Sequence, residues 1–329
     1  MNIRKICVLG GSGFVGRHIV RRLAAQGYEV RVLTRRRERS RELIVLPTVD
    51  VVEANIHDPL ELNRQFDGMD AVINLVGILH EKTPGRIDKP AARRGDFQAV
   101  HIELPRKVLH ACAEAGVKRL LHMSALGADP TGQSAYQRSK GIGEALLREA
   151  ASPHSGHENW YLNGPKFVRG QGLAVTIFRP SVIFGPEDNF LNMFARLLKL
   201  LPLLPLANAR ARFQPVCVED VAHAYVASLA DPATFGQSYD LCGPKAYTLL
   251  ELVQLVAAVS GYRRPIVALC DRLSYLQALL LEFAPGRLMT RDNYYSMKTD
   301  NVCTGPFPPV FGIQPTALEA VAPGYLARR

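Results

Sequence analysis

Three polar side chains in the first half of the chain have the types and spacing that proton transfer requires. Tyr136 and Lys140 are four residues apart where a helix is expected to begin, so both side chains share one helical face. A phenol has a pKa of about 10, and a neighbouring ammonium lowers that pKa by favouring the phenolate. Tyr136 could then exchange a proton with a substrate hydroxyl or carbonyl while a hydride moves, with Ser124 hydrogen-bonded to the same oxygen. We expect Ser124, Tyr136 and Lys140 to be the catalytic residues. A second pair with this spacing, Tyr294 and Lys298, is interpreted as coincidence.

A glycine-rich turn near the N-terminus predicts a dinucleotide site. Residues 6–9 form an apolar run typical of a buried parallel strand, residues 17–26 read as a helix, and residues 29–33 read as a second strand. Glycines at 10, 13 and 16 occupy the turn between the first strand and the helix. They permit a tight turn, close approach of the backbone to a pyrophosphate, and packing of the helix on the strand. The expected cofactor-binding residues of this unit are Gly10, Ser12, Gly13, Phe14, Val15, Gly16 and Arg17.

The end of the second predicted strand favours one of the two nicotinamide dinucleotides. NAD-binding proteins usually place an acid there to bind the ribose 2′-hydroxyl, whereas this chain has Thr34 followed by three arginines. A guanidinium group binds phosphate bidentately, so Arg35 is the first candidate for a 2′-phosphate, with Arg36 and Arg17 in support. We expect NADP(H) to be the preferred cofactor, with NAD(H) as the alternative. The competing interpretation is a solvated arginine loop without a ligand.

Strands and helices continue to alternate, which predicts an α/β fold with a Rossmann-like, doubly wound parallel sheet. Asn55 and Ile56 follow the third strand, where an adenine edge would lie. Val76 and Gly77 lie at the end of the fourth strand, beside the expected cofactor. Further strands are expected at residues 49–52, 70–76, 119–123 and 175–178, and a helix at residues 101–114.

The rest of the chain is expected to form a smaller, mostly helical substrate region. Residues 1–180 are predicted to be the nucleotide-binding domain, and residues 214–243 to return to it through a helix (220–229) and a strand (239–242). The substrate or lid region then comprises residues 181–213 and 244–329. Its apolar helices are expected at residues 190–206, broken by Pro202 and Pro205, and at 249–260 and 271–283. They are interpreted as core helices, or alternatively as a lid or membrane-facing surface suited to a lipid- or quinone-like substrate. Residues 153–172 are predicted to form a surface loop.

Composition excludes several classes of protein. The 329 residues are 47% apolar and 21% charged, as in a globular protein rather than a disordered one. The six cysteines show neither C-x-x-C nor zinc spacing, so we expect no metal site and reduced thiols in a cytosolic protein. The apolar stretches 197–206 and 273–283 are too short to span a bilayer, and no signal peptide is expected. The net charge of +10 permits contact with anionic partners, but the basic residues lack an aromatic stripe, so nucleic acid is not expected. The expected location is cytoplasmic, with peripheral contact at the inner face of a membrane as an option.

Taken together, these motifs resemble the extended or atypical branch of the short-chain dehydrogenase/reductase (SDR) family. The resemblance covers residues 1 to about 300 and rests on the glycine turn, residues 74–77, Ser124, the Tyr136/Lys140 pair and residues 179–186. It implies that Pro180 and Val182 contact the nicotinamide and that the substrate region begins there. One departure is His101, which lies near the position where many SDR proteins carry an active-site Asn.

A narrower set of motifs is similar to the family of NADPH-binding accessory subunits of respiratory complex I (alpha subcomplex subunit 9) and its bacterial relatives. These motifs include Gly143-Glu144, Glu187-Asp188, Phe190-Leu191-Asn192, Gln214-Pro215-Val216, Asp220-Val221 and Thr290-Arg291-Asp292.

Two functions remain open at this point. The chain could be an oxidoreductase that moves a hydride between NADP(H) and the hydroxyl or carbonyl of a small-molecule substrate, with Tyr136 as the acid/base. It could instead be a non-catalytic accessory or assembly subunit that holds NADPH within a protein complex. Tyr136 and Lys140 favour the enzyme, whereas the narrower resemblance and His101 favour the subunit.

Overall fold

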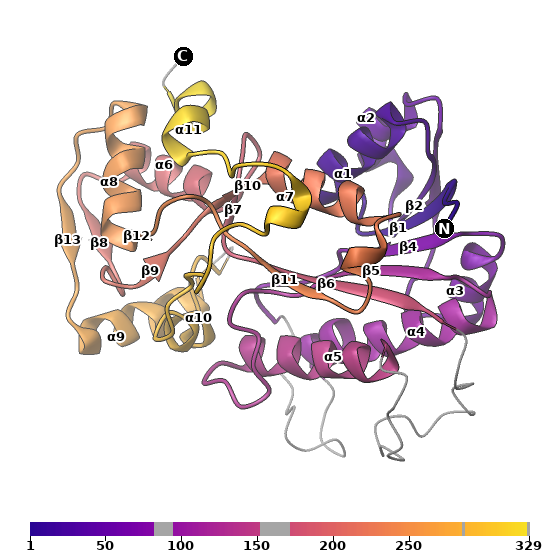
Figure 1. Cartoon of the computed structure of the whole chain (residues 1–329). Helices are drawn as coiled ribbons and strands as arrows, with labels where there is room; N and C mark the ends of the chain where they lie inside the picture. Colours follow the sequence, from indigo (N-terminus) through magenta and orange to yellow (C-terminus); the bar gives the residue numbers. More distant parts are fainter. Residues whose placement is uncertain (82–94, 152–171, 285–286, 328–329) are drawn as a thin grey trace.

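Seven parallel strands form the central sheet of the computed structural model, which describes residues 1–81, 95–151, 172–284 and 287–327 (Figure 1). Their order across the sheet is β11-β6-β5-β4-β1-β2-β3, so the chain reverses direction of travel between β1 and β4. This confirms the predicted doubly wound fold, in which ligands generally bind outside the carboxyl ends of the strands beside such a reversal, here β1 and β4. The strands are β1 (Lys5–Leu9), β2 (Glu29–Thr34), β3 (Val49–Glu53), β4 (Ala71–Asn74), β5 (Arg119–Met123), β6 (Ala174–Pro180) and β11 (Ser238–Leu241).

Helices cover both faces of the sheet because the strands are apolar on both sides. In β1, Ile6 and Val8 enter the core beneath one helical layer, whereas Cys7 and Leu9 enter the core of the opposite layer. The first layer consists of α1 (Phe14–Ala25), α2 (Arg41–Ile44) and α7 (Val218–Ser228). The second consists of α3 (Pro59–Phe66), α4 (Leu104–Glu114) and α5 (Ala135–Ala151), which lie below the sheet in Figure 1.

Two predicted elements have different boundaries in the structure. The helix expected at residues 101–114 is preceded by a π-helical stretch, Gln98–Glu103, which contains His101. The fourth strand ends at Asn74 rather than Val76, because the Asn74 side chain accepts a hydrogen bond from the Val76 N–H and turns the chain away. The predicted loop at 153–172 lies, except for Gly172, outside the described residues.

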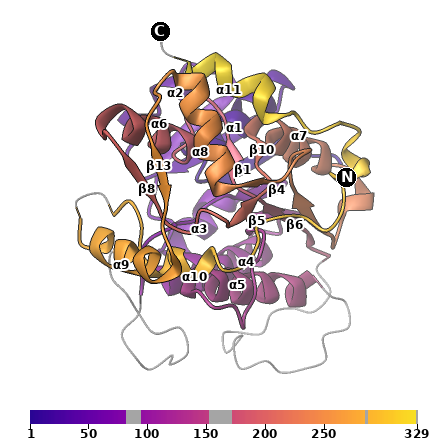
Figure 2. The same ribbon diagram turned by 90° about the vertical axis from the view of Figure 1, so that its left-hand side faces the viewer.

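A smaller layer with its own apolar core lies beyond the carboxyl ends of β6 and β11 (Figures 1 and 2). The helix expected at residues 190–206 is only ten residues long, because Pro202 cannot continue it and Pro205 belongs to a strand. No described helix is long and apolar enough to cross a bilayer. The helices of this layer are α6 (Leu191–Leu200), α8 (Leu249–Ser260), α9 (Asp271–Glu282), α10 (Arg291–Ser296) and α11 (Leu318–Leu326). Its strand pairs are β7 (Ile183–Phe184) with β10 (Val216–Cys217), β9 (Arg212–Phe213) with β12 (Tyr247–Thr248), and β8 (Leu204–Leu206) with β13 (Ile266–Ala268).

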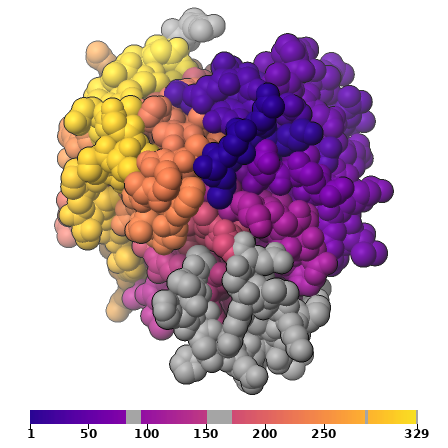
Figure 3. Space-filling view, turned by 45° about the vertical axis from the view of Figure 1, so that its right-hand side comes forward, coloured from indigo at the N-terminus to yellow at the C-terminus, as the bar shows by residue number. Residues whose placement is uncertain are grey.

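The segment that follows α10 returns to the central sheet and corrects one prediction. Cys303 forms a disulfide with Cys242 at the end of β11, with the two Cα atoms 6.1 Å apart, so not all of the cysteines are reduced. The partners are 61 positions apart, and only the return of the chain brings them together. Farther along, Phe307 and Phe311 enter the core beneath α1 and α7, although the sequence had assigned them to the substrate region. Figure 3 shows this yellow C-terminal part and the indigo N-terminal part on one face of the molecule.

Candidate active site

The glycine turn presents the N-terminus of α1 at the carboxyl end of β1. A Cβ on Gly16 would lie 2.3 Å from the Gly10 carbonyl oxygen, so only glycine allows α1 to pack against the turn. Gly10 itself has a positive φ of 78°. Gly13 is different: it caps α1 with extended backbone, is exposed, and donates its N–H to the Gly10 oxygen at 3.0 Å. Ser12 lies 3.4 Å from the Thr34 hydroxyl, and no acid occupies the first turn of α1. These features fit a pyrophosphate at the helix terminus.

The predicted phosphate-binding arginines fall into two groups. Arg35 and Arg36 are exposed directly after β2, and neither guanidinium group has a hydrogen bond or ion pair within the described part of the chain. Arg17, in contrast, donates to Glu42 at 2.6 Å and pairs with Glu187, so its charge is already engaged. The structure therefore leaves Arg35 and Arg36 available to an anion, and uses Arg17 to join α1 to neighbouring segments.

The loop after β3 lies within reach of Arg35. Asn55 is exposed and its side-chain oxygen accepts from the His57 N–H at 3.1 Å, while Ile56 is half-buried. Burial lowers the pKa of His57, and the charges of Lys107 and Arg35 lower it further. The charge of Arg35 therefore acts on the loop that was predicted to border the adenine.

Lys140 and Tyr136 lie near the carboxyl ends of β4 and β5. Lys140 is buried and donates from Nζ to the Met123 carbonyl at 3.0 Å, and a Cβ on Gly77 would lie 3.2 Å from the same nitrogen. Tyr136 is half-buried, and its hydroxyl has no hydrogen bond to any described residue. Tyr136 can therefore offer its hydroxyl to a ligand, and Lys140 approaches the backbone beside the expected nicotinamide.

The expected lowering of the Tyr136 pKa does not occur in the protein alone. Burial raises the pKa of Tyr136 to about 12. Burial also lowers the pKa of Lys140 to about 8, against the charge of Glu144, which raises it. Desolvation is thus the effect that sets the Tyr136 pKa in the protein alone. At neutral pH, Tyr136 is a protonated phenol.

His101 is buried against Tyr136 with both of its ring nitrogens engaged. Nε2 accepts from the Ile78 N–H at 3.1 Å, so the neutral ring carries its proton on Nδ1 and donates to the Ser139 hydroxyl at 2.9 Å. Ser139 in turn donates to the Tyr136 carbonyl at 2.9 Å. Burial, with the charges of Lys140 and His122, lowers the pKa of His101 to about 2, so the ring is neutral. Its centroid is 5.6 Å from that of Tyr136, and Phe97 stacks on it at 5.2 Å. His101 fixes the Tyr136 backbone and forms a wall of the site.

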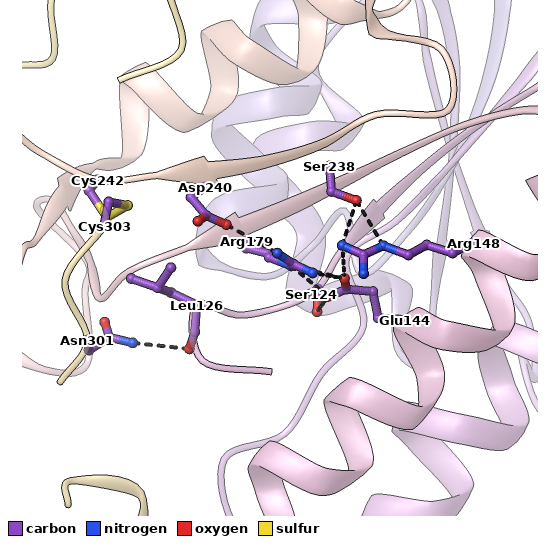
Figure 4. Close-up of polar contacts among 10 residues, drawn as sticks. All are labelled: Ser124, Leu126, Glu144, Arg148, Arg179, Ser238, Asp240, Cys242, Asn301 and Cys303. Atoms are coloured by element: carbon purple, nitrogen blue, oxygen red, sulfur yellow. Dashed lines mark hydrogen bonds and ion pairs between the residues drawn. A yellow bond between two sulfur atoms is a disulfide. The ribbon is translucent and has the colours of Figure 1, made fainter. Parts of the chain in front are cut away.

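The Ser124 hydroxyl is hydrogen-bonded within the protein. Its hydroxyl donates to Glu144 at 2.8 Å, within a network that Figure 4 shows between α5, β6 and β11. Glu144 also accepts from Arg179 at 2.9 Å and pairs with Arg148 at 2.7 Å. In the protein without a ligand, the Ser124 proton is therefore donated to this carboxylate, and the role of Ser124 toward a substrate stays a prediction. Pro180 and Val182, the predicted nicotinamide contacts, follow at the end of β6, buried and half-buried.

One residue that sequence reasoning gave no role holds the start of the helix that carries Tyr136. The carboxylate of Asp292, in α10, accepts from the Ala135 N–H at 2.6 Å and from the Tyr136 N–H at 3.1 Å. It therefore caps α5 from 156 positions away in the sequence, and its charge suits the helix N-terminus. The only signal in the sequence was the motif Thr290-Arg291-Asp292, whose partner could not be read from it.

Comparison with known proteins places this site in a family. Residues 6–242 match the sequence profile of the NAD dependent epimerase/dehydratase family. The chain belongs to this family. It is accordingly a nicotinamide-dinucleotide-binding protein of the extended SDR type.

Proteins with different named functions have sequences similar to that of this chain. The chain is 30% identical, over 95% of its length and 77% of the relative, to NADH dehydrogenase [ubiquinone] 1 alpha subcomplex subunit 9, mitochondrial, from Mus musculus. It is 28% identical, over 81% of its length and 74% of the relative, to ceramide reductase from Caulobacter vibrioides. The solved structure of MoeE5 in complex with UDP-glucose and NAD superposes with a TM-score of 0.70 at 17% identity, covering 98% of this chain and 97% of MoeE5, which shows the shared fold.

Proposed function

We propose that this protein is an NADP(H)-dependent oxidoreductase that reduces a carbonyl group, with Tyr136 as the proton donor. The bound dinucleotide would supply the hydride. The backbone N–H groups in the first turn of α1, directly after Gly13, would bind its pyrophosphate, and Arg35 with Arg36 would bind the 2′-phosphate. The absence of an acid at the end of β2 supports NADP(H) over NAD(H).

The observation that carries the proposal is the protonated Tyr136 hydroxyl, which is free to bind a ligand. Its hydroxyl has no partner among the described residues, and burial keeps it protonated, which is the form that a carbonyl reduction consumes. As a hydride reaches the carbonyl carbon, the phenol would donate its proton to the carbonyl oxygen. The phenolate left behind would be stabilised by Lys140, one helical turn away, before solvent restores the proton.

A lipid-like substrate is the class that the relatives support. One of them is named a ceramide reductase and is similar over 74% of its own length. The carbonyl compound would enter between Tyr136 and the smaller layer, whose apolar core includes Phe194 and Phe213, with the half-buried Phe190 packed against it. We propose a hydrophobic, lipid- or quinone-like carbonyl as the substrate.

A second function, an accessory subunit that holds NADPH without turnover, is favoured by specific observations. The mouse relative is a subunit of NADH dehydrogenase and is similar over 95% of this chain. In addition, both ring nitrogens of His101 and the proton of Ser124 are hydrogen-bonded within the protein, so in this function neither would assist proton transfer at Tyr136. Such a subunit would keep the binding residues and have no use for the phenol.

The two functions are separated by single-turnover oxidation of bound NADPH. The purified protein is loaded with NADPH and mixed with a panel of long-chain keto lipids and quinones. Tyr136→Phe should lower the rate by about 10²–10⁴-fold while NADPH affinity is kept, because only the acidic proton is removed. Tyr294→Phe is the matched control, since Tyr294 also precedes a lysine by four residues.

Each outcome decides between the functions. A rate that survives Tyr136→Phe contradicts the proposed chemistry. Tight retention of NADPH with no oxidation by any carbonyl compound favours the accessory subunit.

A further inference from the structure

One face of α9 is apolar and uncovered. Its outward side chains follow a spacing of three, four and three residues and therefore form a single stripe along the helix. The stripe consists of Leu273, Leu276, Leu280 and Phe283, whose exposed fractions are 49%, 47%, 64% and 79%. The opposite side of α9 is anchored: Ser274 and Ala278 are buried, and Gln277 donates to the Pro205 carbonyl at 2.9 Å. The stripe side chains therefore remain exposed, while the opposite side of α9 packs against the protein.

The strands on the same side of the molecule carry further exposed apolar side chains. The strand β13 leads directly into α9 and carries Val267, which is 43% exposed. Its partner β8 follows Leu203, which is 45% exposed. Figure 2 shows α9 and β13 on the same side of the molecule. We call the α9 stripe, Leu203 and Val267 together the apolar face. A surface of this kind on a monomer marks an interaction site.

The charges beside the apolar face are positive. Arg263 and Arg264 precede β13, and Arg272 lies one helical turn before Leu276 on the same side of α9. All three are exposed, and none forms an ion pair within the described ranges of the chain. The acids nearby are neutralised, because Asp271 pairs with Lys298 and Glu282 pairs with Arg291. An occupant of this face therefore meets leucines flanked by unpaired arginines.

We propose that the apolar face binds the surface of a lipid bilayer that contains anionic phospholipid. An amphipathic helix lying in the plane of a membrane buries its apolar stripe among the acyl chains and places its arginines at the phosphates. The three arginines complement the negative charge of the phospholipid phosphates. A neutral or basic protein surface would offer them no such charge. The contact is peripheral, since α9 is only 12 residues long. It does not depend on the chemistry at Tyr136, although α10, which packs on α9, is the helix that supplies Asp292 to α5.

Binding of the full chain to vesicles tests the proposal. Co-sedimentation is measured with vesicles of phosphatidylcholine alone and with vesicles in which a third of the lipid is phosphatidylglycerol. The native protein should bind the anionic vesicles and bind less as salt is raised, because the arginine contribution is screened. The double variant Leu280→Gln/Phe283→Gln should lose at least about tenfold in affinity, since both side chains enter the acyl region. Val45→Gln/Leu60→Gln is the matched control, with exposed fractions of 76% and 79% in another part of the fold.

A charge series separates the arginines from the leucines. Each of Arg263→Gln, Arg264→Gln and Arg272→Gln should weaken binding to anionic vesicles by about fivefold and leave binding to phosphatidylcholine unchanged. The double variant Arg4→Gln/Lys118→Gln, at exposed sites elsewhere, should have no comparable effect.

Several outcomes would overturn the proposal. They are failure of the native protein to bind either vesicle, equal binding to both, or equal loss in the control variants. Sedimentation velocity compares the oligomeric state of the native protein with that of Leu280→Gln/Phe283→Gln. A native dimer that dissociates in this variant would show that a second copy of the chain covers the apolar face instead.

Discussion

Lys140 offers a direct test of the electrostatics of the site, because its ammonium is held in the interior. Burial lowers its pKa from 10.5 to about 8, and its Nζ donates to the Met123 carbonyl. Lys140→Met keeps a side chain of similar length and apolar character but removes the charge. The free energy of unfolding of the two proteins should therefore respond differently to pH.

The sign and size of the effect follow from proton linkage. The folded pKa lies below the unfolded one, so between about pH 8 and 10.5 the unfolded chain binds more protons than the folded protein. Stability of the native protein therefore rises with pH through that window, as the cost of burying the charge disappears. The shift corresponds to about 3 kcal/mol, to order of magnitude. Loss of the hydrogen bond to Met123 destabilises the variant by an amount that does not depend on pH, so the change with pH isolates the charge.

The measurement is the free energy of unfolding in urea for both proteins between pH 7 and 10.5, without nucleotide. Relative to Lys140→Met, the native protein should gain about 3 kcal/mol across this range. Lys118→Met, at an exposed lysine just before β5, controls for the loss of a lysine in general. NADPH affinity measured on the same samples should be lower in Lys140→Met, because Lys140 approaches Gly77 beside the proposed nicotinamide. A stability difference that stays constant from pH 7 to 10.5 would refute the reasoning.

Three further predictions concern the nucleotide and the packing of α5. NADPH should bind the native protein at least tenfold tighter than NADH, about 1.4 kcal/mol, and Arg35→Asp should weaken NADPH while sparing NADH; equal affinities in the native protein would contradict this assignment. Gly13→Val should abolish nucleotide binding with a native circular dichroism spectrum, since position 13 is exposed and extended, and normal NADPH binding would show that the phosphates lie elsewhere. Gly143→Ala should lower the free energy of unfolding by about 2–3 kcal/mol, because the new Cβ would lie 1.9 Å from the His101 carbonyl oxygen. Gly305→Ala, with no atom within 4 Å of the new Cβ, should be neutral, and equal costs at both glycines would argue against the close contact.

Local patterns in the sequence determined the framework of this protein. The apolar run, glycine turn and helix at the N-terminus need no distant partner, since strand burial, glycine geometry and helix termini act over a few residues. The fifth strand, Arg119–Met123, and the helix Leu249–Ser260 were predicted with the bounds that the structure has. The pairing of Tyr136 and Lys140 on one face of α5 followed from helical spacing. The resemblance of the motifs to the SDR family agrees with the family profile that residues 6–242 match.

Only the tertiary structure decided which residues around the site are bonded to one another. Ser124 bonds to Glu144, Asp292 caps α5, and Cys242 joins Cys303, across separations of 20, 156 and 61 positions. Nothing in the local sequence encodes such partners, because they depend on which segments the sheet and its crossovers bring together. The Tyr136 pKa is a property of the same kind. Spacing predicted that Lys140 would lower it, but the burial of Tyr136 raises it, and burial is set by all the segments packed around the side chain.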